Sequence, residues 1–272
     1  MTLLAQIFQL AAADGRVAAI GTEGSHNDPA VPADVWSDLD VTVFVREPLG
    51  DDAWSAWVCA LGQPIIWQHL LNRDLFGPSS AVWDTYLVRY AGTARIDWKF
   101  APIADLDQYL AADSLNTIVW RDGQELSPRE TNASSHVVKL PLPSEFIDVV
   151  NEVLWCAGNV AKALYRGNLV HANAQLDDNV RPGVLQLLSW QVALSRNDFD
   201  AGSHWKFLAD ALPEALRQLL FSSYAQADLK QCHASLQTLI DLCESASRNL
   251  ARQLQVELPD WFEPGLKQLR EW

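Results

Sequence analysis

The stretch that decides the fold is Ser37-Asp-Leu-Asp-Val-Thr-Val-Phe-Val45. Residues 41–45 are all β-branched or aromatic, a composition typical of a buried strand. Asp38 and Asp40 lie two residues apart, and residues at that spacing on a strand point to the same side of a sheet. We therefore expect two carboxylates side by side at the start of this strand.

Two neighbouring carboxylates repel each other unless a cation lies between them. A hard divalent ion such as Mg²⁺ is the obvious candidate, because it prefers carboxylate oxygens and usually brings substrate phosphates with it. Gly24-Ser25 precedes the acidic pair, and backbone amides in such a turn can contact a phosphate. Asp-x-Asp also occurs often by chance, so the alternative of simple turn or surface aspartates stays open.

A third carboxylate occurs in Thr93-Ala-Arg-Ile-Asp-Trp98. Asp97 lies on a predicted strand that follows a tight turn at Ala91-Gly92. If this strand lies beside the first one, Asp97 can join Asp38 and Asp40. Three carboxylates on adjacent strands can hold a metal ion and activate a hydroxyl group for phosphoryl or nucleotidyl transfer.

The chain changes character at Pro141-Leu-Pro143. Residues 1–142 alternate between helical and strand-like patterns and predict a small mixed α/β domain. Residues 143–272 show only helical patterns and predict a helical bundle. The expected fold class is therefore α+β, with a mixed sheet and flanking helices followed by the bundle.

The predicted elements follow the apolar periodicity of the chain. The sheet half has expected helices at 1–14, 51–61 and 104–111, and expected strands at 17–20, 40–45, 65–68, 83–90, 94–100 and 117–121. In the second half, Ser144 is expected to cap a helix that runs to about residue 166. Further helices are expected from about 182 and at about 203–211, 213–224 and 228–254.

Composition narrows the range of partners. The formal net charge of −14 argues against nucleic acid, whose backbone requires clustered Lys and Arg. The same charge suits a cationic small substrate, although acidity can also serve solubility alone. No apolar run is long enough to span a membrane. The start of the chain lacks the basic region and cleavage site of a secretory signal, and the four cysteines lack metal-ligand spacing, so we expect a cytoplasmic protein without membrane partners.

Basic residues of the helical half are candidates for phosphate contacts. Lys162 and Arg166 are four residues apart and share a helix face, where they either contact a triphosphate or form a solvated basic edge. Lys206 has the same two interpretations. Among the twelve tryptophans, most are expected in packing, and Trp36 or Trp98 can stack on a ligand because they neighbour the acidic residues.

Six segments together carry a family resemblance. They are Glu23-Gly-Ser-His-Asn27, Ser37-Asp-Leu-Asp-Val41, Arg95-Ile-Asp97, Val160-Ala-Lys-Ala-Leu-Tyr-Arg166, Val180-Arg-Pro-Gly-Val-Leu-Gln-Leu-Leu-Ser-Trp190 and Trp205-Lys-Phe-Leu208. In this order, over about residues 17–258, the chain resembles the nucleotidyltransferase superfamily, in particular the bacterial aminoglycoside 6-adenylyltransferases, also called streptomycin adenylyltransferases.

The resemblance implies an enzyme with a nucleotidyltransferase domain at residues 1–142 and a helical acceptor-binding domain at 143–272. It implies ATP as the donor, Mg²⁺, and transfer of AMP to a hydroxyl of a streptomycin-like aminoglycoside, which gives antibiotic resistance. The implied metal ligands and catalytic acids are Asp38, Asp40 and Asp97, the last as metal ligand or general base. The implied nucleotide-binding residues are Gly24, Ser25 and Lys162, with Lys206 as a further candidate.

Three positions depart from the family pattern. His26 replaces an expected arginine, Ala174 an expected acidic residue, and Trp98 an expected small aliphatic residue. The first change concerns phosphate affinity and the others concern the acceptor. A nucleotidyltransferase with another acceptor (an antibiotic, a metabolite or a protein hydroxyl) and a non-catalytic nucleotide-binding relative therefore remain as alternatives.

Overall fold

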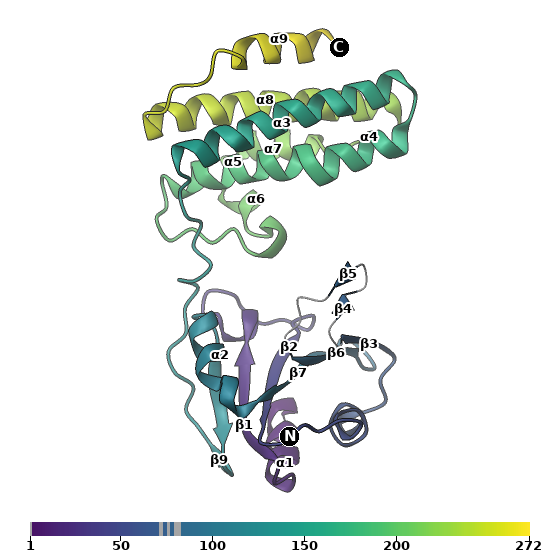
Figure 1. Ribbon diagram of the computed structural model, residues 1–272, viewed down its shortest axis with the longest axis vertical. Helices are drawn as coiled ribbons and strands as arrows, with labels where there is room; N and C mark the ends of the chain where they lie inside the picture. The colour runs from purple at the N-terminus through teal and green to yellow at the C-terminus, as the bar shows by residue number, and fades with distance from the viewer. Residues whose placement is uncertain (1, 71–72, 75–76, 79–82) are drawn as a thin grey trace. The chain divides into compact units, whose positions relative to one another are not determined.

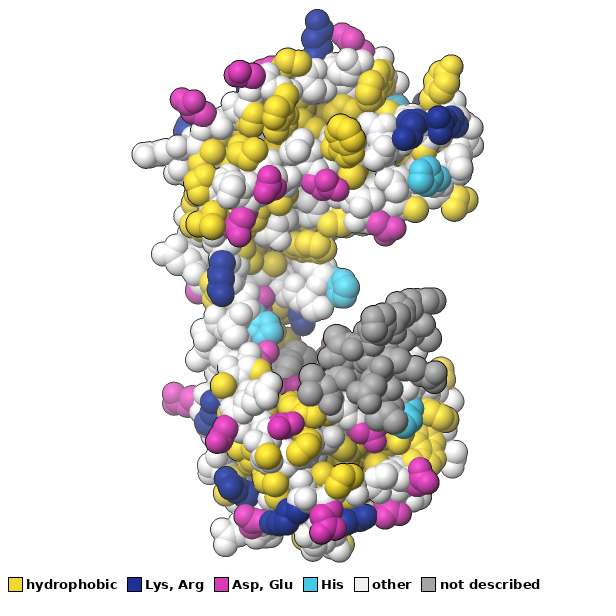
Figure 2. All heavy atoms as spheres, viewed as in Figure 1, with side chains coloured by type: hydrophobic (Ala, Val, Ile, Leu, Met, Phe, Trp, Pro, Cys, Tyr) yellow, Lys and Arg dark blue, Asp and Glu magenta, His cyan; other side chains and the backbone are white. Residues whose placement is uncertain are grey.

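The computed structural model describes residues 2–70, 73–74, 77–78 and 83–272. The chain forms two compact units, Met1–Ser135 and His136–Trp272 (Figure 1). Residues 136–142 belong with the second unit, because Val137 pairs with Asp200 and the Val138 N–H donates to the Phe199 carbonyl at 2.8 Å. Figure 2 shows basic and acidic side chains interspersed over one face of both units.

The first unit is built on a mixed sheet. Within the described residues, seven strands form this sheet in the order β3-β6-β7-β2-β1-β8-β9. They are β1 (Val17–Glu23), β2 (Leu39–Val45), β3 (Ile66–Leu70), β6 (Asp84–Arg89), β7 (Arg95–Pro102), β8 (Thr117–Arg121) and β9 (Gln124–Glu125). The central strands β2 and β7 run parallel, whereas the other described pairs in the sheet are antiparallel. Short β4 (Arg73–Asp74) and β5 (Gly77–Pro78) pair separately.

Helices cover both faces of the sheet. Apolar side chains at alternate positions of β2 and β7, such as Val43 and Trp98, share one core with α1 (Leu3–Ala13) and the helical segment η2 (Ala53–Val58). On the opposite face, Phe44 and Ala101 share a second core with α2 (Leu106–Ala112). The two strands are therefore buried on both sides, as central parallel strands require.

Several sequence expectations change in the structure. The expected strand at 17–20 extends to Glu23, because Gly21, Thr22 and Glu23 pair with residues of β2. The expected helix at 51–61 is a π-helical segment, η2, followed by the 3-10 turn η3 (Cys59–Leu61). Trp98 was a candidate for ligand stacking, but its ring is fully buried and packs edge-on against Trp57. That interpretation was wrong.

The second unit is helical. Its elements are α3 (Pro143–Tyr165), α4 (Leu169–Gln175), η5 (Leu176–Val180), α5 (Arg181–Ala193), η6 (Ser203–Trp205), α6 (Leu208–Ala211), α7 (Glu214–Ser222), α8 (Leu229–Leu254) and α9 (Phe262–Glu271). One core joins them through apolar faces such as Val150 and Val153 of α3 and Leu236 and Leu239 of α8. The predicted α+β fold with a C-terminal helical region is confirmed. No described helix is both long and apolar enough to cross a membrane.

Helix ends in the second unit also differ from expectation. The cap residue of α3 is Leu142 rather than Ser144, with Pro143 at the first helical position, which suits its fixed φ and missing N–H. The Glu145 carboxylate accepts from the Leu142 N–H at 2.8 Å. The expected helix at 203–211 is two short pieces, η6 and α6, and His204 and Trp205 adopt left-handed φ values of 52° and 58°.

Candidate active site

Four carboxylates converge where β1, β2 and β7 meet. Asp40 pairs with Asp97 across the parallel strands β2 and β7, and with Glu23 across β1 and β2. Asp38 lies one residue before β2 begins. We call Glu23, Asp38, Asp40 and Asp97 the acidic cluster.

The alternation of each strand places the cluster on one face of the sheet. Asp40, Thr42 and Phe44 alternate along β2, and their register partners on β7 are Asp97, Lys99 and Ala101. Phe44 and Ala101 lie under α2, and residues two apart share a face. The acidic cluster therefore lies on the α2 side of the sheet, at the amino ends of β2 and β7.

Arg95 is the cation that contacts two members of the cluster. Its Nε and Nη2 atoms donate to the two oxygens of Asp97 at 3.0 and 2.5 Å. Its Nη1 lies 3.2 Å from Asp38 Oδ2. The hydrogen bond with Asp97 also raises the pKa of Arg95, so the guanidinium stays charged.

A second cation lies deeper on the same face. Lys99 Nζ is 2.9 Å from Glu23 Oε2, and the Thr42 hydroxyl donates to Glu23 Oε1 at 2.9 Å. Glu23 therefore has a partner on each oxygen. The four carboxylates of the acidic cluster outnumber its two cations, Arg95 and Lys99, so negative charge is in excess around Asp40.

This excess of negative charge contributes to a raised pKa of Asp40. Burial, with the neighbouring Asp97, Asp38 and Glu23, raises the pKa of this carboxyl to about 7 against the opposing effect of Lys99. A carboxyl in this environment resists ionisation until more positive charge arrives. A cation bound beside Asp40 would therefore be stabilised by its carboxylate and would favour its ionised form.

The Gly24-Ser25 turn is pressed against Asp40. Gly24 has a φ of +67°, and a Cβ atom at this position would lie 2.6 Å from Asp40 Oδ2. The turn is held from behind by Asn27, whose side-chain amide donates to the Leu115 carbonyl at 2.8 Å and accepts from the Thr22 hydroxyl at 3.1 Å. Only glycine permits both this φ and this approach of backbone to carboxylate.

Three aspartates fit the chemistry of a hard metal ion, because carboxylate oxygens are the ligands Mg²⁺ prefers. As they lie, no group of three acidic, His or Cys side chains among the described residues is already arranged as a metal site. Arg95 donates to both oxygens of Asp97 and contacts Asp38. Asp38, Asp40 and Asp97 as metal ligands remain a prediction that the donor chemistry supports.

The structure brings five of the sequence-predicted residues together in the first unit: Gly24, Ser25, Asp38, Asp40 and Asp97. Lys162 and Lys206 belong to the second unit. Lys162 lies on α3 and donates to Asn159 Oδ1 at 3.2 Å, and Lys206 places its amine over the ring of Phe207 at 4.7 Å. Their predicted contact with a nucleotide is not tested by these interactions.

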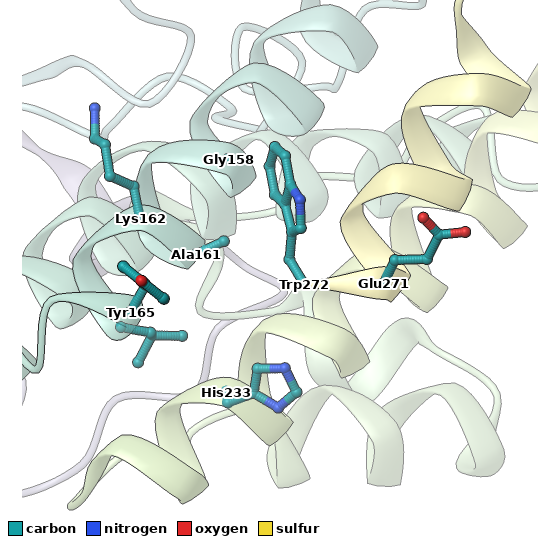
Figure 3. Close-up of a pocket in the computed structure, with 8 residues that line it drawn as sticks. Gly158, Ala161, Lys162, Tyr165, His233, Glu271 and Trp272 are labelled. Atoms are coloured by element: carbon teal, nitrogen blue, oxygen red, sulfur yellow. The ribbon is translucent and has the colours of Figure 1, made fainter.

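Lys162 also lines a cavity of about 760 Å³ between α3, α8 and α9. Trp272, Tyr165, His233 and Glu271 are among the other lining residues. Figure 3 shows the Lys162 amine pointing away from His233. This cavity lies wholly within the helical unit.

Sequence reasoning did not assign roles to Glu23, Arg95 and Lys99. The sequence feature that could have indicated them is a two-residue spacing of polar side chains. It occurs at Arg95, Asp97 and Lys99, and again at Asp38, Asp40 and Thr42. Such alternating polar residues in an otherwise apolar pair of strands indicate one polar site on one face. The pairing partners of these charges depend on strand register, which the sequence alone did not supply.

The fold defines the class of protein. It is a nucleotidyltransferase fold, and it superposes on a crystal structure of an aminoglycoside 6-adenyltransferase from Bacillus subtilis with a TM-score of 0.50. That superposition covers 98% of this chain and 96% of the other, at 22% sequence identity. The model of the streptomycin adenylyltransferase family matches residues 1–264, and the chain belongs to this family.

Two relatives are similar to this chain over most of their length. An aminoglycoside 6-adenylyltransferase from Bacillus subtilis (strain 168) is 26% identical over 92% of this chain and 89% of its own length. An enzyme of the same name from Campylobacter jejuni is 25% identical over 94% of this chain and 90% of its own length. The chain is therefore an enzyme of the nucleotidyltransferase class.

Proposed function

We propose that this enzyme transfers AMP from ATP to a hydroxyl group of a streptomycin-like aminoglycoside, with Mg²⁺ as the metal. The observation that carries the proposal is the register of Asp40 opposite Asp97 on parallel strands, with Asp38 at the start of β2, in a chain of this family. The acceptor class comes from the names of the relatives. The reaction would inactivate the antibiotic in the cytoplasm and so give resistance.

The first unit contains the groups that this chemistry requires. Asp38, Asp40 and Asp97 would hold the metal, which when bound neutralises and orients the triphosphate for in-line attack. The Gly24-Ser25 turn offers backbone N–H groups beside these acids. The close approach of Gly24 to Asp40 supports a triphosphate bound where the turn adjoins the acidic cluster.

Asp97 has a second proposed role. The attacking acceptor hydroxyl must lose its proton, and a carboxylate within hydrogen-bond reach can accept it. Asp97 is buried and both of its oxygens are engaged by Arg95. As general base or metal ligand, Asp97 would share its oxygens with Arg95 or displace Arg95 from one of them.

The helical unit is the proposed source of acceptor recognition. A polycationic acceptor needs acidic side chains, and four were candidates: Glu145, Glu152, Asp177 and Asp178. Glu145 caps α3, Glu152 accepts from Cys156 Sγ at 3.1 Å, and Asp177 pairs with Arg181 at 2.9 Å. Asp178 is exposed on η5, and we favour it among the four. Lys162 and Lys206 remain the proposed basic partners of the triphosphate.

A direct assay tests the function. The purified enzyme is incubated with ATP, Mg²⁺ and a panel of aminoglycosides that includes streptomycin, and products are analysed by mass spectrometry. We expect one acceptor to gain the mass of a single AMP, with release of pyrophosphate. The reaction should disappear in EDTA and in Asp40→Asn, and should persist in Asp107→Asn, a matched change of an exposed acid on α2.

The roles of Asp97 are separated by binding measurements. Asp97→Asn should abolish turnover under either role. If the variant still binds Mg·ATP and acceptor normally, Asp97 is the base; if Mg·ATP binding is lost as well, Asp97 is mainly a metal ligand. Turnover of ATP with no adenylylated aminoglycoside would refute the proposed acceptor and favour another hydroxyl compound.

A further inference from the structure

Arg95 occupies the position that a cation would take among the aspartates. Its guanidinium forms two parallel hydrogen bonds with Asp97, on Oδ1 at 3.0 Å and on Oδ2 at 2.5 Å. The remaining nitrogen lies 3.2 Å from Asp38 Oδ2. Bidentate pairs of this kind are the strongest charge-assisted hydrogen bonds that a carboxylate makes in proteins.

This contact competes directly with a divalent ion. A carboxylate whose two oxygens face a guanidinium has its strongest acceptor positions filled. A divalent ion approaching Asp97 and Asp38 also meets the positive charge of Arg95 at close range. A carboxylate has about four lone-pair sites and Arg95 donates to each oxygen of Asp97, so in this arrangement a metal ion competes with Arg95 for Asp97.

The geometry also permits release. The Arg95 side chain is 32% exposed, whereas that of Asp97 is only 10% exposed. Arg95 is the first residue of β7, so its side chain can swing into solvent without disturbing the sheet. Lys99 is held differently: its partner Glu23 is also bound by Thr42.

We propose that Arg95 is a built-in counter-cation that gates the metal site. It neutralises Asp38 and Asp97 while the enzyme is metal-free, and it must release Asp97 before a divalent ion binds. This inference rests on the proposed function, because it assumes that these aspartates hold the metal. It adds that Arg95 blocks the metal site in the metal-free enzyme, and that the site opens when a divalent ion replaces Arg95 at Asp97.

Metal binding without turnover tests the proposal. Mn²⁺ serves as the probe, and its free concentration is followed by electron paramagnetic resonance in wild type, Arg95→Gln and Arg95→Lys. Because removal of a charge-assisted pair eliminates a competitor, we expect Arg95→Gln to bind Mn²⁺ about tenfold to a hundredfold more tightly. Arg95→Lys should lie between the two, since lysine keeps the charge but loses the bidentate fork.

Arg89→Gln is the matched control. Arg89 faces Arg95 across β6 and β7 and is exposed, so its loss changes the same local charge without freeing Asp97. We expect a far smaller change in Mn²⁺ affinity than in Arg95→Gln. If Arg95 only kept the cluster ordered, Arg95→Gln would bind Mn²⁺ more weakly than wild type, because a disordered cluster binds metal more weakly.

A measurement on the wild-type enzyme covers the case of a variant that folds poorly. The Arg95 Nε–H, bonded to Asp97, should give a distinct ¹H–¹⁵N resonance, assigned by its loss in Arg95→Lys. Saturating Mg²⁺ should shift or remove that resonance. An unchanged resonance in Mg²⁺-bound enzyme, or equal Mn²⁺ affinity in wild type and Arg95→Gln, overturns the gate and leaves the metal site standing. Absence of Mn²⁺ binding in every variant overturns the metal site and the gate together.

Discussion

Asp40 is a residue whose ionisation state is linked to the stability of the fold. Its pKa is about 7 in the folded protein because of burial and the nearby Asp97, Asp38 and Glu23. The value in an unfolded chain is about 3.9. The folded state therefore binds a proton more tightly, and the free energy of unfolding falls as pH rises from about 4 to about 7.

Asp40→Asn should remove this dependence. In EDTA at about pH 8 the variant should be more stable than wild type by roughly 1–3 kcal/mol, an amount reduced from about 1.4 kcal/mol per pKa unit by partial solvation. The difference should shrink toward about pH 3, below both pKa values, where wild-type Asp40 is protonated in both states. Urea unfolding across this range measures it, with Asp107→Asn as control. Lower stability of Asp40→Asn at the higher pH would contradict the prediction.

Gly24 is the second residue that the site requires. Alanine there should cost roughly 1–2 kcal/mol for its left-handed backbone, and its Cβ would also push Asp40 Oδ2 from a distance of 2.6 Å. Gly92→Ala is the control: its φ is +78°, but no atom lies within 4 Å of the added Cβ. Both variants should lose stability in urea, Gly24→Ala at least as much as Gly92→Ala, and only Gly24→Ala should lose turnover. Equal turnover in the two variants would separate Gly24 from the acidic cluster.

Among the elements, α5 begins with a buried arginine that ties it to the segment after α7. Arg181 donates from Nε to Asp177 at 2.9 Å, and from Nη1 and Nη2 to the hydroxyl and carbonyl of Ser223 at 2.6 and 2.8 Å. Its guanidinium also stacks on Tyr224 at 3.9 Å. Asp177 therefore forms a structural ion pair with Arg181, which makes it a weaker candidate for binding the aminoglycoside.

Arg181→Met should destabilise the protein by roughly 2–4 kcal/mol, because it removes the donor to the Ser223 carbonyl and the cation paired with Asp177, whose remaining hydrogen bond comes from Gln226. Arg217→Met is the control, since Arg217 pairs with Glu214 on the surface of α7, where ion pairs contribute little. Thermal and urea unfolding should show a large effect for Arg181 and a change under about 0.5 kcal/mol for Arg217. Similar losses in both variants would count against this role of Arg181.

At the scale of the whole molecule, the net charge of −14 bears on the acceptor. Exposed acidic groups attract a polycation, and salt screens that attraction over a Debye length of about 10 Å at 0.1 M. Acceptor affinity should therefore weaken steeply between about 0.05 and about 0.5 M NaCl. Calorimetric titration measures this slope, and Asp178→Asn should flatten it. An affinity independent of salt would argue against a polycationic acceptor.

Some site residues can be predicted from local sequence patterns, whereas others depend on contacts between distant strands. Asp38, Asp40 and Asp97 were found from spacing and apolar context, because a strand's two-residue repeat is visible in the sequence. The proposal that strand 94–100 lies beside strand 40–45 depended on long-range pairing, which the structure supplies as Asp40 opposite Asp97. Arg95 was read as part of a motif: its spacing of two from Asp97 places both on one face, but its contact with Asp38 depends on the pairing of β2 with β7.

The sequence by itself determined the two-part α+β organisation, the strand with paired aspartates, the Gly-Ser turn and the long helices α3 and α8. These follow from local periodicity and propensity, which act between residues close in the chain. Only the tertiary structure decided which charges meet: Arg95 with Asp38, Lys99 with Glu23, and Arg181 with Ser223. Arg95 and Asp97 share a face through the two-residue repeat of β7. The contacts of Arg95 with Asp38, Lys99 with Glu23 and Arg181 with Ser223 join distant segments, so they depend on register, packing and burial that no local pattern encodes.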